Sequence, residues 1–344
     1  MSTSNRFHFL DSLRGFAVAG ILLVNAADLM CLGYDVPVRP FQTIPLAENV
    51  LNFLVATRFV PIFSFMFGMS MGFVIDSAVR RGEAGWKILL RRLGALVIIG
   101  LLNSILYPDE ILRDYAVVGA ILLPFVLKVP RSVRLVLGLL ATIGAYAFTG
   151  GGALSLPGLF LLGSAAQAYD LPARLEHADR RIGAATLVFA AASAAAIPWQ
   201  AAEGGDPRFF TAGGVAGGLM ACLYVCLLAL LWRTPARRAL SAVFEPLGRM
   251  ALTCYVTASF VMVPAGVLLD SRSAQDVIPG LIVAAAVLPI QWVFCRLWLS
   301  RFAYGPLEWA WRCVTWWRWV PLQRRQSKQL DPVNYVPGTT AGIA

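Results

Sequence analysis

The chain has 344 residues, of which 58% are hydrophobic and only 14% are charged, and its mean hydropathy is +0.68. Soluble domains carry about 25% charged residues, so this composition excludes an ordinary soluble fold and indicates that lipid surrounds most of the chain. The net charge of +10 does not indicate nucleic-acid binding, because no basic run stands apart from an apolar segment.

Apolar segments recur along the whole chain at the length that a membrane span requires. A bilayer core is crossed by about 20 apolar residues in a helix. The predicted spans are 11–30, 51–75, 88–107, 112–128, 133–149, 155–169, 182–200, 212–232, 249–269 and 278–299. The sequence therefore predicts an all-α, polytopic integral membrane protein with about ten transmembrane helices, joined by short connections.

The basic residues are distributed unevenly between the two sides of this arrangement. With the N-terminus in the cytoplasm, most of the 29 Lys and Arg residues fall in cytoplasmic connections. The opposite connections hold only Arg39, Arg113, Arg208 and Arg272. Because Lys and Arg favour the cytoplasmic side, we expect both termini to be cytoplasmic and the protein to lie in the bacterial cytoplasmic (inner) membrane.

Four polar side chains interrupt the first predicted span, namely Asp11, Arg14, Asn25 and Asp28. In a helix Arg14 and Asn25 share a face, with Asp28 roughly 40° to one side and Asp11 about 60° to the other. A polar stripe facing lipid is costly, so this stripe is predicted to face protein or a water-filled cavity. The alternatives are a local Arg14–Asp11 pair and an Asn25 that only holds helices together.

The second and third spans add further polar groups. Arg58 lies inside the second span, where it requires a partner, and we expect that partner to be Asp28 or Glu110. Arg92 and Asn103 are again eleven residues apart and share a face of the third span. The following loop contributes Asp109, Glu110, Arg113, Asp114 and Tyr115. These features predict an outward-facing polar pocket built by the first four helices.

The later spans are mostly apolar and carry features of membrane packing. "TAGGVAGGL" in the eighth span contains overlapping pairs of small residues that allow close helix contact. "EWAWRCVTWWRW" mixes Trp and Arg, which indicates a segment at the inner membrane surface. We therefore divide the chain into an N-terminal region of polar helices (1–130), a C-terminal transmembrane region with the Trp-rich segment (131–320) and a disordered cytoplasmic tail (321–344).

Several stretches of the chain resemble the YeiB-like integral membrane proteins of bacteria, whose C-terminal half is known as a domain of unknown function. The resemblance runs from end to end, and its first and last stretches are the most specific. They are "LDSLRGFAVAGILLVN" (Leu10–Asn25), "FSFMFGMSMGF" (Phe63–Phe73), "RRLGALVIIGLLNSILYPDEILRDYAVVG" (Arg91–Gly119), "GRMALTCY" (Gly248–Tyr255) and "GPLEWAWR" (Gly305–Arg312).

The first of these stretches is also similar to the opening helix of the membrane acyltransferase superfamily, with Asn25 at the position of its characteristic polar residue. This resemblance implies transfer of an acyl group from cytoplasmic acyl-CoA across the membrane. The chain departs from the YeiB-like pattern at several positions. Asn103 stands where His is usual, Asp109-Glu110 replaces Gly-Asp, and Cys254 and Ala258 replace Asn and Gln. Loss of that His removes the residue that titrates nearest neutral pH.

The residues and the resemblance together predict an acyltransferase-like protein. The base that accepts the acceptor's proton is expected to be Glu110 or Asp114. The side chains expected to orient the acceptor or the thioester oxygen are Asn25, Asn103 and Arg58. The side chains expected to bind the substrate or the acyl-CoA are Arg14, Arg91, Arg92 and Asp28.

The expected partners are the lipid bilayer and a glycan, lipid or small-molecule acceptor, and homo-oligomerisation stays open. Acyl-CoA is the donor that the resemblance implies, and neither a nucleotide-binding motif nor a His-rich metal site is present in the sequence. The alternatives are a transporter or exporter of a small molecule or lipid-linked metabolite, because intramembrane charges also line transport paths, and a membrane scaffold. No internal repeat of the kind common in transporters is evident.

Overall fold

The structure is a computed structural model that describes residues 6–37, 45–177 and 180–323. The helices of the N-terminal part are α1 (His8–Leu29), α2 (Leu46–Leu54), α3 (Phe59–Val79), α4 (Gly85–Asn103), α5 (Leu112–Lys128), α6 (Arg131–Thr149) and α7 (Leu156–Ala168). The remaining helices are α8 (Leu171–His177), α9 (Arg180–Glu203), α10 (Thr211–Leu231), α11 (Ala236–Arg249), α12 (Ala251–Leu268), α13 (Ile278–Arg301) and α14 (Pro306–Trp316). Short 3-10 helices η2 (Gly152–Ser155) and η3 (Ser271–Ser273) complete the described elements, which include no β-strand.

Seven helical segments among the described residues are long and apolar enough to cross a membrane. They are His8–Leu29, Leu46–Val79, Arg131–Thr149, Arg181–Glu203, Thr211–Leu231, Ala251–Leu268 and Ile278–Arg301. Helices α4, α5 and α7 occupy the three other predicted spans, but each is either shorter or richer in charge. The all-helical, membrane-spanning character is therefore confirmed, whereas the number of ten spans and the cytoplasmic position of both termini stay predictions.

Two predicted spans differ from the helices that form. The second span, 51–75, is broken between α2 and α3, where Thr57 has a left-handed backbone (φ 65°) and Arg58 turns inward. The ninth predicted span, 249–269, begins two residues too early, because Arg249 ends α11 and a bend at Met250 separates it from α12. The amphipathic helix α11 was not predicted, because its polar face and Pro246 obscure the apolar side that packs inward.

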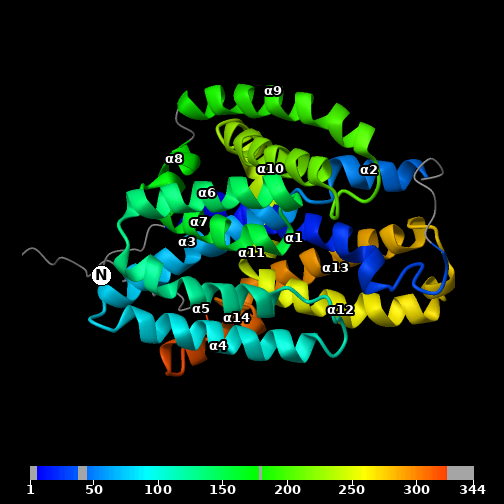
Figure 1. Cartoon of the computed structure of the whole chain (residues 1–344). Coiled ribbons are helices and arrows are strands. Elements are labelled where there is room, and N and C mark those ends of the chain that lie inside the picture. Colours follow the sequence, from blue (N-terminus) through cyan, green and yellow to red (C-terminus); the bar gives the residue numbers. More distant parts are fainter. Residues whose placement is uncertain (1–5, 38–44, 178–179, 324–344) are drawn as a thin grey trace, which may run out of the picture.

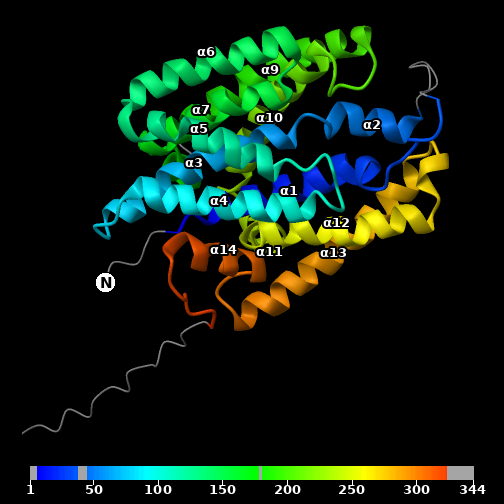
Figure 2. The ribbon, with the colours of Figure 1, turned by 60° about the horizontal axis from the view of Figure 1, so that its bottom comes forward.

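Helix α1 lies near the centre of the bundle in both views (Figures 1 and 2). It contacts α3, α8, α10, α11, α12 and α13. Its side chains enter three separate hydrophobic clusters, through Phe9 and Leu13 in the first, Leu22 and Ala26 in the second, and Val18 in the third. A helix with apolar contacts on several sides is buried, so the polar groups of α1 must find their partners inside the protein.

Glycines allow several pairs of helices to pack with their backbones in contact. A Cβ atom added to Gly248 of α11 would lie 1.8 Å from the carbonyl oxygen of Asp11, and one added to Gly15 of α1 would lie 1.9 Å from that of Phe244. In α10, a Cβ on Gly214 would lie 1.6 Å from the carbonyl oxygen of Gly150. The close packing predicted for the glycines of the eighth span is thus confirmed.

The Trp-rich helix α14 packs against α4 and α12 beside one end of the bundle (Figure 2). The buried carboxylate of Glu308 accepts hydrogen bonds from the backbone N–H groups of Leu252 (2.7 Å) and Thr253 (3.0 Å) and from the Thr253 hydroxyl (2.6 Å). Burial raises the pKa of this carboxyl, and those three bonds partly oppose the rise. Glu308 therefore caps α12 and fixes α14 to it. The predicted tail, 321–344, falls almost wholly outside the described residues.

The α1–α11 crossing yields a test of the fold. We expect Gly248→Ala to lower the free energy of unfolding by about 1–3 kcal/mol or more, because the new methyl group must separate two backbones. The measurement is the midpoint of thermal unfolding of the protein in detergent, followed by Trp fluorescence. Gly94→Ala in α4 is the matched control, because its added Cβ meets no atom within 4 Å. Equal midpoints for the two variants would contradict the described crossing.

Candidate functional site

Three arginines from three helices meet at the end of the bundle where α1 begins and α3 ends, which we call the basic end. The charges of Arg14 (α1) and Arg312 (α14) both act on Arg92 of α4. The Arg92 guanidinium lies 3.6 Å from the ring centre of Trp311 and donates a weak hydrogen bond to Ser70 Oγ at 3.4 Å. We call Arg14, Arg92 and Arg312 the basic cluster.

The basic cluster has little negative charge to balance it. Arg14 pairs with Asp11 at 3.1 Å, which is the local pair considered as an alternative above. Within the described ranges, neither Arg92 nor Arg312 forms an ion pair with a carboxylate. Like charges repel strongly where water is scarce, so an anion bound here would be stabilised. Arg91, the third predicted acyl-CoA ligand, is exposed and faces Trp317 instead.

A narrow, mostly apolar crevice that contains a few polar groups lies farther along α1, between α1, α12 and α13. Its polar or hydroxyl-bearing lining groups are Asn25, Tyr107, Tyr255, Ser259 and Gln291. The remaining lining residues are Val18, Ile21, Leu22, Leu29, Cys254 and Ala258. The crevice has a volume of about 10 Å³, which is room for about one water molecule. The predicted inward orientation of Asn25 agrees with its place in this lining.

The backbone of Asn103 is hydrogen-bonded to Tyr107, which is one of the crevice-lining residues. The backbone N–H of Tyr107 donates to the carbonyl oxygen of Asn103 at 3.0 Å, and the Tyr107 ring packs among residues of α1 and α12. The side-chain amide of Asn103 is only 2% exposed, and neither its oxygen nor its nitrogen has a hydrogen-bond partner among the described residues. A buried amide without partners is costly, so this group is available to a bound molecule.

Glu110 stands at the start of α5 and acts as its cap. Its carboxylate accepts hydrogen bonds from the backbone N–H groups of Leu112 and Arg113. Burial raises the pKa of the Glu110 carboxyl, and the two N–H groups partly offset this rise. Its charge also acts on Tyr255, which lines the crevice. Glu110 therefore adjoins the crevice through Tyr255.

Asp114, the other predicted base, is more exposed. Its side chain is 45% exposed and pairs with Arg113 at 3.6 Å. The predicted site residue Asp28 is also engaged elsewhere, because it forms an ion pair with Arg208, in the connection before α10. That ion pair holds Arg208 beside Asp28 and Asp206, which together raise the pKa of the Arg208 guanidinium.

The expectation that Arg58 pairs with Asp28 or Glu110 was wrong. The Arg58 side chain is fully buried, but it contacts neither Asp28 nor Glu110. Its guanidinium donates to Gln200 Oε1 of α9 at 2.7 Å and to Thr57 Oγ1 at 2.9 Å. The break between α2 and α3 turns the side chain toward α9 and α10, away from α4 and α5. The hydrogen-bond partners of Arg58 are therefore uncharged, and the residue lies apart from the crevice.

Sequence reasoning missed four crevice groups, Tyr107, Tyr255, Ser259 and Gln291. Gln291 could have been found by the argument used for Asn25, because an amide inside an apolar span faces the protein interior. Its Nε2 donates to the carbonyl oxygen of Cys254 at 2.8 Å. Cys254 and Ala258, two positions where the chain departs from the YeiB-like pattern, also line the crevice. No group of three His, Cys, Asp or Glu residues suited to a metal occurs in the described part.

Comparison with known proteins gives relatives but no assigned activity. A family described as "Protein of unknown function (DUF418)" matches residues 170–318. An uncharacterized 39.9 kDa protein from the amylase 3' region of Bacillus acidopullulyticus is 30% identical over 342 residues, which cover 94% of this chain and 97% of that protein. The uncharacterized protein YxaH of Bacillus subtilis (strain 168) is 27% identical, with the same coverage of 94% and 97%. No solved structure matches the chain at a significant level.

The environment of Glu110 predicts a pH dependence of stability. Because its pKa is raised in the folded protein, the folded state holds this proton more tightly than the unfolded state does. Stability from this group is therefore present at low pH and is lost as the pH rises above the ordinary value of about 4.5. We expect Glu110→Gln to flatten that decline in thermal unfolding midpoints measured in detergent between acidic and neutral pH.

Asp114→Asn serves as the control for this measurement, because the Asp114 side chain is 45% exposed. We expect its unfolding midpoints to follow those of the unmodified protein at every pH. Parallel curves for Glu110→Gln and the unmodified protein would show that the Glu110 carboxyl is not held in the described environment.

Proposed function

The chain belongs to the DUF418 family of proteins of unknown function, and from this premise we propose that it transfers an acyl group from cytoplasmic acyl-CoA to a membrane or extracytoplasmic acceptor. In this proposal the chain crosses the bacterial cytoplasmic membrane ten times with both termini in the cytoplasm. The basic end then faces the cytoplasm, where acyl-CoA is present, and the crevice faces the acceptor. The acceptor is a glycan, a lipid or a small molecule.

The basic cluster is the observation that carries this proposal. Arg14, Arg92 and Arg312 converge from three helices, and the latter two have no carboxylate partner in the described ranges. Guanidinium groups bind phosphate oxygens through paired, charge-assisted hydrogen bonds. CoA presents several phosphate charges on a flexible arm that ends in the thioester. A cluster of arginines at the cytoplasmic face suits the phosphates of such a donor.

The crevice supplies polar groups for the other end of the donor. Asn25 lies eleven residues after Arg14 on α1, a rise of about 16 Å along the helix axis. A donor with its phosphates on the basic cluster would extend its thioester along α1 toward Asn25. Tyr255 lines the crevice, and the buried amide of Asn103 has no hydrogen-bond partner among the described residues. The crevice must widen to admit the acyl group.

The reaction joins the acceptor to the acyl carbon and releases CoA. The acceptor oxygen or nitrogen attacks the thioester carbonyl carbon, the carbon–sulfur bond breaks, and CoA leaves as the thiolate. The amide N–H groups of Asn25 and Asn103 stabilise the developing oxyanion. Glu110 or Asp114 accepts the acceptor's proton. Glu110 is buried beside Tyr255, whereas Asp114 is open to an acceptor arriving from outside. Arg58 has no role in this geometry.

Export of a small molecule is the second candidate function, and Arg58 is the observation that favours it. This arginine is fully buried, and its hydrogen-bond partners are all uncharged. Buried cations within membrane segments mark substrate paths in many carriers. A carrier would move its substrate past Gln200 and Arg58 between α3, α9 and α10 without consuming acyl-CoA.

Transfer of radiolabelled acetyl groups from acetyl-CoA in proteoliposomes tests the proposal. We expect Arg92→Gln to raise the KM for acetyl-CoA about ten- to hundredfold, because a charge-assisted hydrogen bond contributes roughly 1.5–3 kcal/mol. Arg91→Gln, which changes the exposed neighbouring charge, is expected to leave KM unchanged. Asn25→Ala is expected to lower kcat with little change in KM, because its amide acts on the oxyanion.

Folding of each variant is checked by its thermal unfolding midpoint. Absence of transfer to membrane lipid or glycan fractions by the folded protein would refute acyl transfer. Counterflow uptake that is independent of acyl-CoA and is abolished by Arg58→Gln would establish the export function instead. Equal effects of Arg92→Gln and Arg91→Gln on KM would show that the basic cluster does not bind the donor.

A further inference from the structure

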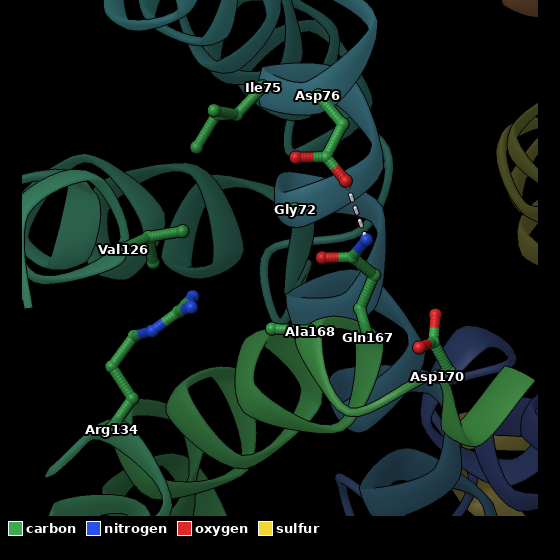
Figure 3. Close-up of a pocket in the computed structure, with 8 residues that line it drawn as sticks. All are labelled: Gly72, Ile75, Asp76, Val126, Arg134, Gln167, Ala168 and Asp170. Carbon is green, nitrogen blue, oxygen red and sulfur yellow. Dashed lines mark hydrogen bonds between the residues drawn. The ribbon is translucent and has the colours of Figure 1, made fainter. Parts of the chain in front are cut away.

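A second cavity opens at the basic end on another face of α3, away from the basic cluster. It has a volume of about 320 Å³, within the usual range for small-molecule sites, about 300–1,000 Å³. Figure 3 shows its lining side chains, which come from four helices and the turn after α7. They belong to Gly72, Ile75, Asp76, Val126, Arg134, Gln167, Ala168 and Asp170. We call this cavity the α3–α7 pocket.

Arg134 of α6 forms one wall of the α3–α7 pocket. Its side chain is only 9% exposed, and its guanidinium points into the cavity (Figure 3). Nη1 donates a long hydrogen bond to the Ser164 carbonyl oxygen at 3.4 Å, while Nε has no partner among the residues described. A buried guanidinium with unused donors and no adjacent carboxylate favours an anionic group in front of it.

Asp76 of α3 lies across the cavity from Arg134. Gln167 Nε2 donates to Asp76 Oδ2 at 2.7 Å and holds that carboxylate in place (Figure 3). Gly72 makes this possible, because a Cβ there would lie 2.2 Å from Gln167 Oε1. The other carboxylate oxygen, Oδ1, is left to face the cavity, and Asp170 adds a second carboxylate at the rim (Figure 3).

Opposite charges are therefore held apart on two walls of one cavity. Arg134 and Asp76 are farther apart than the 4 Å of an ion pair, although the charge of Asp76 acts on Arg134. Their helices are fixed by separate packing contacts, α3 on α7 and α6 on α7, so they do not close on each other. A ligand with both charges would satisfy both walls.

We propose that the α3–α7 pocket binds a small zwitterion that carries a phosphate and a primary ammonium group. The phosphate lies on Arg134 through charge-assisted hydrogen bonds, and the ammonium lies on Asp76. Ile75 and Val126 provide apolar contact for the carbons between or beyond these groups. The pocket lies at helix ends, which stand at the depth of lipid headgroups in the ten-span arrangement proposed above, so the zwitterion is either a phospholipid headgroup or a free solute.

Binding of phosphoethanolamine to the full-length protein in nanodiscs of phosphatidylglycerol tests this site. We expect saturable binding by calorimetry that Arg134→Gln weakens about ten- to hundredfold. Lys128→Gln, which removes an exposed charge at the same end of the bundle, is the matched control and should not change it. Asp76→Asn keeps the shape and should remove the preference for phosphoethanolamine over inorganic phosphate. If Arg134→Gln does not fold, Asp76→Asn still tests the site.

The source of the zwitterion is resolved by changing the lipid. Weaker binding of phosphoethanolamine in nanodiscs that contain phosphatidylethanolamine indicates that the headgroup occupies the pocket, and equal binding indicates a free solute. No saturable binding in phosphatidylglycerol nanodiscs, or equal effects of Arg134→Gln and Lys128→Gln in folded protein, overturns the proposal. Acetyl-CoA transfer, measured in parallel, is not expected to depend on Arg134, so the two proposals fail separately.

Discussion

A polar side chain within a lipid-embedded bundle must find its partner inside the protein, and this constraint organises the structure. Helix α1 shows its effect most directly, because α1 has apolar contacts on several sides and still carries charged and amide groups. Arg14 meets the backbone of α11, Asn25 lines the crevice, and Asp28 pairs with a loop arginine. Arg14, Asn25 and Asp28 of α1 thus each face a different part of the protein interior.

The glycine crossing of α1 and α11 and the polar contacts of α1 support one another. Because Gly15 and Gly248 bring the two backbones together, Arg14 reaches the carbonyl oxygen of Gly248, at 3.5 Å. The same crossing leaves the Arg14 guanidinium close enough to act on Arg92. A small-residue contact between apolar helices thus determines where charge gathers at the basic end.

Helical periodicity predicted most of the long apolar helices and the inward direction of Asn25, but it missed the amphipathic helix α11 and the amide of Gln291. Asn25 is at the crevice because a single amide in an apolar helix has only one favourable direction. The partner of Arg58 could not be predicted, since Gln200 is distant in sequence and uncharged, and a carboxylate was the natural expectation. The α3–α7 pocket was missed for another reason: Asp76 and Arg134 resemble ordinary flanking charges until three helices place them across one cavity.

Helix α14, which is made late in synthesis, packs against α4, which is made early. Glu308 caps α12, and Trp311 donates to the carbonyl oxygen of Arg92 at 2.7 Å while its ring covers that guanidinium. Helix α14 is the last described helix to leave the ribosome, whereas α4 is among the first. The Arg92 guanidinium therefore stays uncovered while every intervening helix is made, and a nascent chain that stops before α14 leaves this arginine without the Trp311 ring that covers it.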